Sequence, residues 1–130
     1  MATAGAARTQ GQLFALVFGI VYVLIGLLGF IGPLAPGGAL LGLFGINALH
    51  NIVHLAVGAL LLFGSTSPAQ AKTINLVVGI VYLLVAVLGL FNILVPGLIN
   101  HNGADTALHF VSGALALYFG TAGAGRTATA

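Results

Sequence analysis

The chain has 130 residues, of which 60% are hydrophobic and only 3% are charged. A water-soluble domain carries about 25% charged residues, so the composition excludes a mainly water-facing surface and favours lipid as the solvent. The net charge of +2 does not indicate a nucleic-acid partner, and the absence of cysteine excludes disulfide, thiol and iron–sulfur chemistry.

Four apolar stretches approach the roughly 20 residues that a membrane-spanning helix needs. We predict an all-α integral membrane protein with transmembrane helices at about 12–32, 46–64, 73–95 and 102–120. The predicted order is hairpin 12–64, cytoplasmic loop 65–72 and hairpin 73–120. The Ala-, Thr- and Gly-rich ends, residues 1–11 and 121–130, lack an apolar face and are predicted to be mobile tails.

The two predicted hairpins are related in sequence. Val17–Phe30 aligns without a gap on Val77–Leu90, with eight identities among 14 positions, and Asn47–Phe63 aligns on Asn102–Tyr118. Each copy crosses the membrane twice, so the two tandem repeats are expected to have the same, parallel orientation.

The few cations predict the orientation. Arg8, Lys72 and Arg126 all fall on one side of a four-helix arrangement, and the other two loops contain no Lys or Arg. The positive-inside rule then places both termini in the cytoplasm. We expect a multi-pass protein of the bacterial cytoplasmic (inner) membrane, surrounded by the lipid bilayer and associated with a membrane-protein partner or a second copy of itself.

Small residues follow one face of several predicted helices. They recur at spacings of three and four, which places them on a common stripe, and they are Gly19, Gly26, Gly29, Gly58, Gly79, Ala86, Gly89 and Gly113. Such stripes let helices approach closely in lipid, so we expect helix packing here. A bed for a flat ligand is the alternative interpretation.

A polar stripe lies on the second and fourth helices. Asn47, Asn51 and His54 share a face, as do their counterparts Asn102, Thr106 and His109. Tyr22 and Tyr82 lie at mid-helix, where a phenol needs a partner. We predict Tyr22–His54 and Tyr82–His109 hydrogen bonds within the hairpins.

The same stripe contains candidate ligands. His50 and His54 are four residues apart, as are Asp105 and His109, so each pair projects to one side of its helix. If the second and fourth helices meet, three imidazoles and one carboxylate converge, a set suited to Zn²⁺ or Fe.

Other interpretations of these residues remain open. His54 and His109 are also candidate axial ligands of a tetrapyrrole, either haem or a chlorophyll-type pigment; the lack of Arg or Lys in this half disfavours haem propionates. A proton or ion relay through the stripe would end at the apolar segment after Gly58. In the simplest interpretation, the polar groups only join the helices.

No catalytic motif is present, whether a nucleophile–base pair, phosphate loop or carboxylate pair. We therefore expect a non-enzymatic membrane protein, first as a structural or accessory subunit of a larger complex. The alternative is a metal- or tetrapyrrole-binding protein using His54 and His109, and a proton or ion relay is third. The cofactor is thus unknown: none, a metal ion or a tetrapyrrole.

The chain from Leu13 to Gly120 resembles a family of small bacterial four-helix membrane proteins catalogued as a domain of unknown function. The resemblance lies in the glycine-rich first helix with its Gly-Ile-Val-Tyr segment and in the Asn-x2-His-x3-Gly element of Asn51, His54 and Gly58. The second copy has Thr106 in place of the asparagine. The resemblance implies a cytoplasmic-membrane protein and brings no assigned activity.

Overall fold

The computed structural model describes residues 7–93 and 97–128, and within them the chain is all-α apart from one short strand pair. The four α-helices are α1 (Gln10–Leu28), α2 (Ala48–Gly64), α3 (Pro68–Leu90) and α4 (Gly103–Gly120). The α1–α2 connection contains the 3-10 turns η1 (Gly32–Leu34) and η2 (Pro36–Gly38) and the antiparallel strands β1 (Ala39–Leu40) and β2 (Phe44–Gly45).

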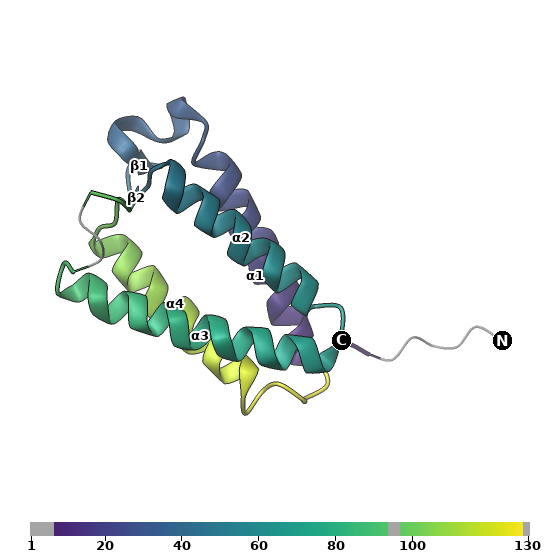
Figure 1. Ribbon diagram of the computed structural model, residues 1–130. Helices are drawn as coiled ribbons and strands as arrows, with labels where there is room; N and C mark the ends of the chain where they lie inside the picture. Colours follow the sequence, from purple (N-terminus) through teal and green to yellow (C-terminus); the bar gives the residue numbers. More distant parts are fainter. Residues whose placement is uncertain (1–6, 94–96, 129–130) are drawn as a thin grey trace.

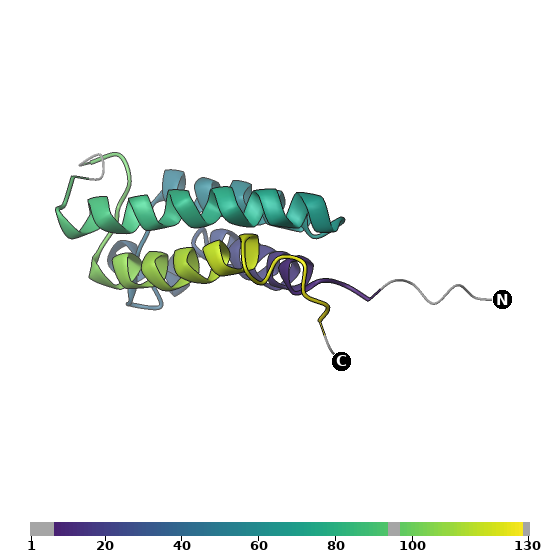
Figure 2. The same ribbon diagram turned by 90° about the horizontal axis from the view of Figure 1, so that it is seen from below.

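The helices form two hairpins, α1–α2 and α3–α4, that lie side by side (Figure 1). Both views place the chain ends and the α2–α3 connection at one end of the bundle, here called the tail end (Figure 2). The α1–α2 and α3–α4 connections lie at the opposite end, called the loop end. The tail end therefore has the three cations Arg8, Lys72 and Arg126, all exposed.

Each helix begins at a polar cap. Thr9 caps α1 and Asn102 caps α4, both in reciprocal capping boxes, whereas Asn47 caps α2 and Ser67 caps α3 ahead of Pro68. These side chains satisfy amide groups that have no partner inside the helix.

The observed bounds differ from the predicted ones mainly at α1 and α3. α1 ends at Leu28 and not near residue 32, because the chain turns before Pro33. α3 starts at Pro68, so the connection between α2 and α3 is residues 65–67 and is shorter than the predicted 65–72 loop. The helix starts there because Ser67 caps it and proline is favoured at the first helical position. α3 also ends at Leu90, and the last two residues of the predicted 73–95 helix lie outside the described residues.

The described parts of the two predicted tails pair with each other. Thr9 and Thr127 form an antiparallel bridge, with Gln10 N–H donating to Arg126 O at 2.7 Å and Ala128 N–H donating to Arg8 O at 2.9 Å. This pairing needs no apolar face, because it consists of backbone hydrogen bonds. The mobility of the tails stays a prediction.

Glycine brings the helices of each hairpin into backbone contact. A Cβ on Gly58 of α2 would lie 2.7 Å from the Val23 backbone nitrogen, and one on Gly113 of α4 would lie 2.9 Å from the equivalent nitrogen of Leu83. Gly19 likewise faces Leu62. The stripes are covered by a neighbouring helix, which leaves no surface there for a flat ligand.

An apolar core joins the hairpins toward the tail end. Its buried residues include Phe14, Tyr22, Leu61, Val78 and Tyr82. At the loop end, asparagine side chains bridge the hairpins instead: Asn47 Nδ2 donates to Leu98 O, and Asn102 Nδ2 donates to Leu43 O, both at 2.8 Å. The space between these two layers contains the histidines.

Two helices, α1 and α3, are long and apolar enough to cross a membrane, with mean hydropathy 2.3 and 2.5. Their exposed side chains are largely aliphatic, as in Leu24, Leu27, Ile80 and Leu84. This supports a membrane protein, although helices of this kind also occur in soluble cores.

The glycine contact gives a testable expectation. Gly58→Leu should force α1 and α2 apart and lower the free energy of unfolding by about 1–3 kcal/mol or more, as overpacking does. The measurement is helicity by circular dichroism during sodium dodecyl sulfate titration. Gly103→Ala is the matched control, because a Cβ there meets nothing within 4 Å. Equal midpoints for the two variants would contradict the close contact.

Candidate metal centre

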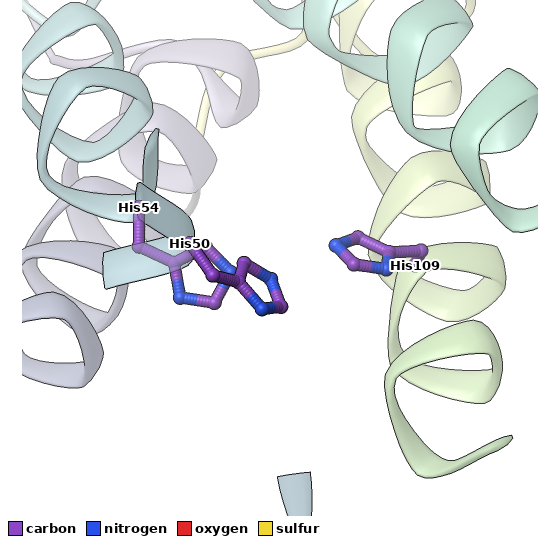
Figure 3. A group of neighbouring side chains, drawn as sticks. All are labelled: His50, His54 and His109. Carbon is purple, nitrogen blue, oxygen red and sulfur yellow. The ribbon is translucent and has the colours of Figure 1, made fainter. Parts of the chain in front are cut away.

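All four histidines of the chain lie together between the hairpins. His50 and His54 project from α2 and His109 from α4, and Figure 3 shows the three rings pointing toward one another. One nitrogen from each of these three lies within 4.8 Å of the others. All three residues are buried, with at most 4% of their surface exposed. His101, in the loop before α4, stacks on His109 with a centroid distance of 5.4 Å.

His50 is held in one tautomer by backbone carbonyls. Its Nδ1 lies 2.9 Å from Gly45 O and 2.8 Å from Asn100 O. A carbonyl only accepts, so Nδ1 must carry the proton, which leaves the Nε2 lone pair free. Histidine ligands of metals are characteristically oriented in this way.

Within residues 7–93 and 97–128, neither ring nitrogen of His54 has a hydrogen-bond partner, although the residue is only 3% exposed. A neutral imidazole has one donor and one acceptor, and leaving such groups unmet in a buried site costs about 1–3 kcal/mol each. Most buried polar groups in proteins are satisfied. His54 therefore has an acceptor nitrogen that is available inside this buried cluster.

The predicted tyrosine–histidine hydrogen bonds are not formed. Tyr22 meets His54 edge-on at a centroid distance of 5.4 Å, and Tyr82 meets His109 at 4.9 Å and 90°. Within the described residues, neither phenol oxygen hydrogen-bonds to a histidine. The prediction paired the correct residues but gave them the wrong interaction. The tyrosine and histidine rings form T-shaped contacts, and the hydroxyls do not donate to the imidazole nitrogens as expected.

His109 has its polar contact with His101 instead. The distance from His101 Nε2 to His109 Nδ1 is 3.4 Å. Burial lowers the pKa of His101, an effect that the nearby Asp105 carboxylate opposes. A neutral His101 accepting from His109 Nδ1–H leaves Nε2 of His109 free. Sequence reasoning did not include His101 in the site; its position between Asn100 and Asn102, just before a helix cap, was the available signal.

Asp105, predicted as a fourth ligand, takes a structural position in this structure. Its Oδ2 accepts from Gly45 N–H at 2.9 Å and from Asn102 N–H at 2.8 Å, and it is absent from the group of three histidines. The reason is local: as the third residue of α4, it closes the capping box with Asn102. Gly45 thereby joins both helices, donating to Asp105 and accepting from His50.

The remaining polar residues of the stripe serve structural contacts. Asn47 and Asn102 cap helices and bridge the loops, and Thr106 Oγ1 donates to Asn102 O at 3.2 Å. Asn51 is buried against Gly29 of α1, and its Oδ1 has no partner. None of these belongs to the three-histidine group.

Two cavities adjoin the histidines. The inner one, about 120 Å³, is lined by all four histidines together with valines, Tyr82 and Ile99. The outer one, about 350 Å³ at the loop end, is lined by Asn47, Asn92 and Asn100, among others. Ile99 and His101 line both cavities. The inner cavity is smaller than the roughly 300 Å³ or more of typical cofactor sites, which disfavours a tetrapyrrole.

The fold and site define a small all-α chain, with two helices able to span a membrane and a buried cluster of imidazoles. The chain belongs to the family described as Domain of unknown function (DUF4383), whose model matches residues 12–122. This confirms the predicted membership of a domain family of unknown function. No curated protein and no solved structure matches the chain.

Asp105 allows a test of its structural position. Asp105→Ala removes acceptors for two backbone amides and should lower the free energy of unfolding by about 2–4 kcal/mol, since bonds to charged groups contribute about 1.5–3 kcal/mol each. Asp105→Asn keeps an oxygen acceptor and should lose less. Unfolding by denaturant titration compares the two, and equal losses would show that the amide contacts do not determine stability.

Proposed function

We propose that this chain is an integral membrane protein whose four helices all cross the bilayer as two parallel-oriented hairpins. The shorter helices α2 and α4 pack along α1 and α3, which supports a membrane-spanning position for them as well. They also expose apolar side chains to the surroundings, namely Ile52, Leu60, Val111 and Leu115. At 1.5 Å per residue the helices are about 25–35 Å long, close to the ~30 Å hydrocarbon layer.

The gathering of Arg8, Lys72 and Arg126 at the tail end supports a cytoplasmic location for both termini. The corresponding compartment is the bacterial cytoplasmic membrane. The loop end, with its asparagine bridges and outer cavity, then faces the opposite side.

We propose that His50, His54 and His109 bind a divalent transition-metal ion between the hairpins. The observation that carries this is His54: a buried imidazole with neither nitrogen bonded, placed within 4.8 Å of two other histidine nitrogens. A metal ion would satisfy its acceptor nitrogen.

The geometry needs only a small contraction. Zn–N bonds of 2.0–2.1 Å in a tetrahedron place ligand nitrogens about 3.4 Å apart, against the present limit of 4.8 Å. Side-chain rotation of His54, which no hydrogen bond restrains, supplies this movement. Imidazoles suit Zn, Cu, Ni and Fe ions, and we propose Zn²⁺ as the first ion to test.

Three protein ligands leave a fourth position that opens into the 120 Å³ inner cavity. A water molecule or small ligand would occupy it. The function is binding and not catalysis in this proposal, since the chain has a single acid, Asp105, and it is engaged with two backbone amides.

The apolar core between the site and the tail end makes a relay across the membrane less favourable. The function as an accessory subunit stays a prediction, and no feature of the described residues favours it over the alternatives. Co-purification of the tagged protein with a larger complex would support it, and it is compatible with metal binding.

The metal proposal is tested by titrating Zn²⁺ into purified, chelator-treated protein, with Co²⁺ as a coloured probe. We expect one ion per chain, a loss of at least 100-fold in affinity for His54→Leu and His109→Leu, and a tetrahedral Co²⁺ spectrum. Ser112→Ala is the control, because this buried hydroxyl donates to Leu108 O of its own helix and lies outside the three-histidine group.

Binding that is absent, or that survives His54→Leu, would overturn the proposal. A Soret band or pigment absorption in the protein as purified would favour the tetrapyrrole alternative. His54→Leu should meanwhile leave the metal-free protein at least as stable as the parent, because it removes an unsatisfied buried polar group.

His101 provides a prediction about access. It lines both cavities and lies 3.4 Å from His109, so it is placed to pass an ion inward from the loop end. His101→Ala should slow Zn²⁺ loading severalfold in stopped-flow measurements while one ion per chain still binds. Asn92→Gly is the control, because Asn92 lines the outer cavity and glycine tolerates its φ of 53°. Unchanged loading in His101→Ala would exclude this route.

A further inference from the structure

A second candidate site lies at the opposite end of the molecule, on the outer surface. A groove of about 420 Å³ runs between α1 and α4 near the tail end and is lined almost entirely by apolar side chains. Leu13, Val17 and Tyr118 are each more than 40% exposed there. Phe14 and Phe119 stack at 4.9 Å to form its base.

The groove exists because α1 and α4 belong to different hairpins. Each packs closely on its own partner helix, whereas few contacts join α1 to α4. In the membrane orientation proposed above, this groove opens to the lipid of the cytoplasmic leaflet. The inference rests on that orientation and not on the metal site.

The tail pairing places two arginines at the end of this groove. Thr9 and Thr127 are opposite one another in the antiparallel bridge. Gln10 lines the groove, its N–H donates to Arg126 O at 2.7 Å, and Arg8 lies two residues before it, so both arginines lie beside the end of the groove. Arg8 and Arg126 are diagonal neighbours in this pairing and are both exposed.

No acid offsets this charge, because the only acid, Asp105, lies near the loop end. A pair of exposed arginines beside an apolar groove matches one chemistry, an anionic headgroup attached to an acyl chain. We propose that the α1–α4 groove, with Arg8 and Arg126, is a binding site for an anionic phospholipid.

The test uses the full-length protein equilibrated with vesicles of equal phosphatidylglycerol and phosphatidylcholine, followed by native mass spectrometry of the retained lipid. We expect one tightly retained phosphatidylglycerol per chain. Each arginine should contribute about fivefold to the preference for phosphatidylglycerol over phosphatidylcholine. The double variant Arg8→Gln/Arg126→Gln should therefore have a preference about 25-fold lower than that of the parent.

Lys72→Gln is the matched control, since it removes the third cation at the same end, from the first turns of α3. It should leave the preference unchanged. Val17→Trp fills the groove and should reduce retention of both lipids without changing helicity or Zn²⁺ binding, which separates this inference from the metal proposal.

Two results would overturn the inference. Equal losses for Lys72→Gln and the arginine variants would indicate only diffuse attraction to an anionic surface. A dimer broken by Val17→Trp would indicate that a second copy of the chain, and not a lipid, covers the groove.

Discussion

Backbone contact at glycine within each hairpin is the constraint on which the rest of the structure depends. Gly58 lies against Val23 and Gly113 against Leu83, so close that a single Cβ would collide with backbone. Bulky side chains are thereby excluded from the α1–α2 and α3–α4 seams. Tyr22, Tyr82 and the histidines occupy the space between the hairpins, where several of their rings form T-shaped pairs.

Much of this arrangement is readable from the sequence, because helical spacing is a local property. A four-residue separation places His50 and His54 on one side of α2, and the aligned glycines predict the same seam in both hairpins. Capping motifs are equally local: Asn102 and Asp105, three residues apart, form a capping box. Treating Asp105 as a free ligand neglected that local competition for its carboxylate.

The features that sequence could not provide depend on contacts between distant segments. His101 joins the cluster because Asn100, its neighbour, donates to Gly38 O and Ile46 O of the other hairpin. Likewise the pairing of Thr9 with Thr127 joins the two ends of the chain, and nothing periodic in either tail signals it. Local patterns carry no information on such pairings.

The point where the two hairpins differ is also where they are joined. His50 and Asp105 occupy equivalent positions, yet one donates to the Gly45 carbonyl and the other accepts from the Gly45 amide. A single residue, Gly45, thus uses both of its backbone polar groups to hold α2 and α4 in register. Two carboxylates could not complete this arrangement, because an ionised carboxylate only accepts and the Gly45 carbonyl needs a donor.

This junction leaves the deeper groups without partners. His54 lies beyond the reach of the loop carbonyls, and Tyr22 and Tyr82 belong to the apolar core; within the described residues, the His54 nitrogens and both phenol oxygens have no hydrogen-bond partner. Each such group lowers stability, so a bundle selected for packing alone would have apolar residues at these positions. His54 and Tyr82 line the inner cavity, and Ile99 and His101 are common to this cavity and the outer one at the loop end. The metal ion proposed above would offset part of the cost at His54 if it entered from the loop end, whereas entry from the tail end would require it to pass Leu61 and Val78 of the apolar core.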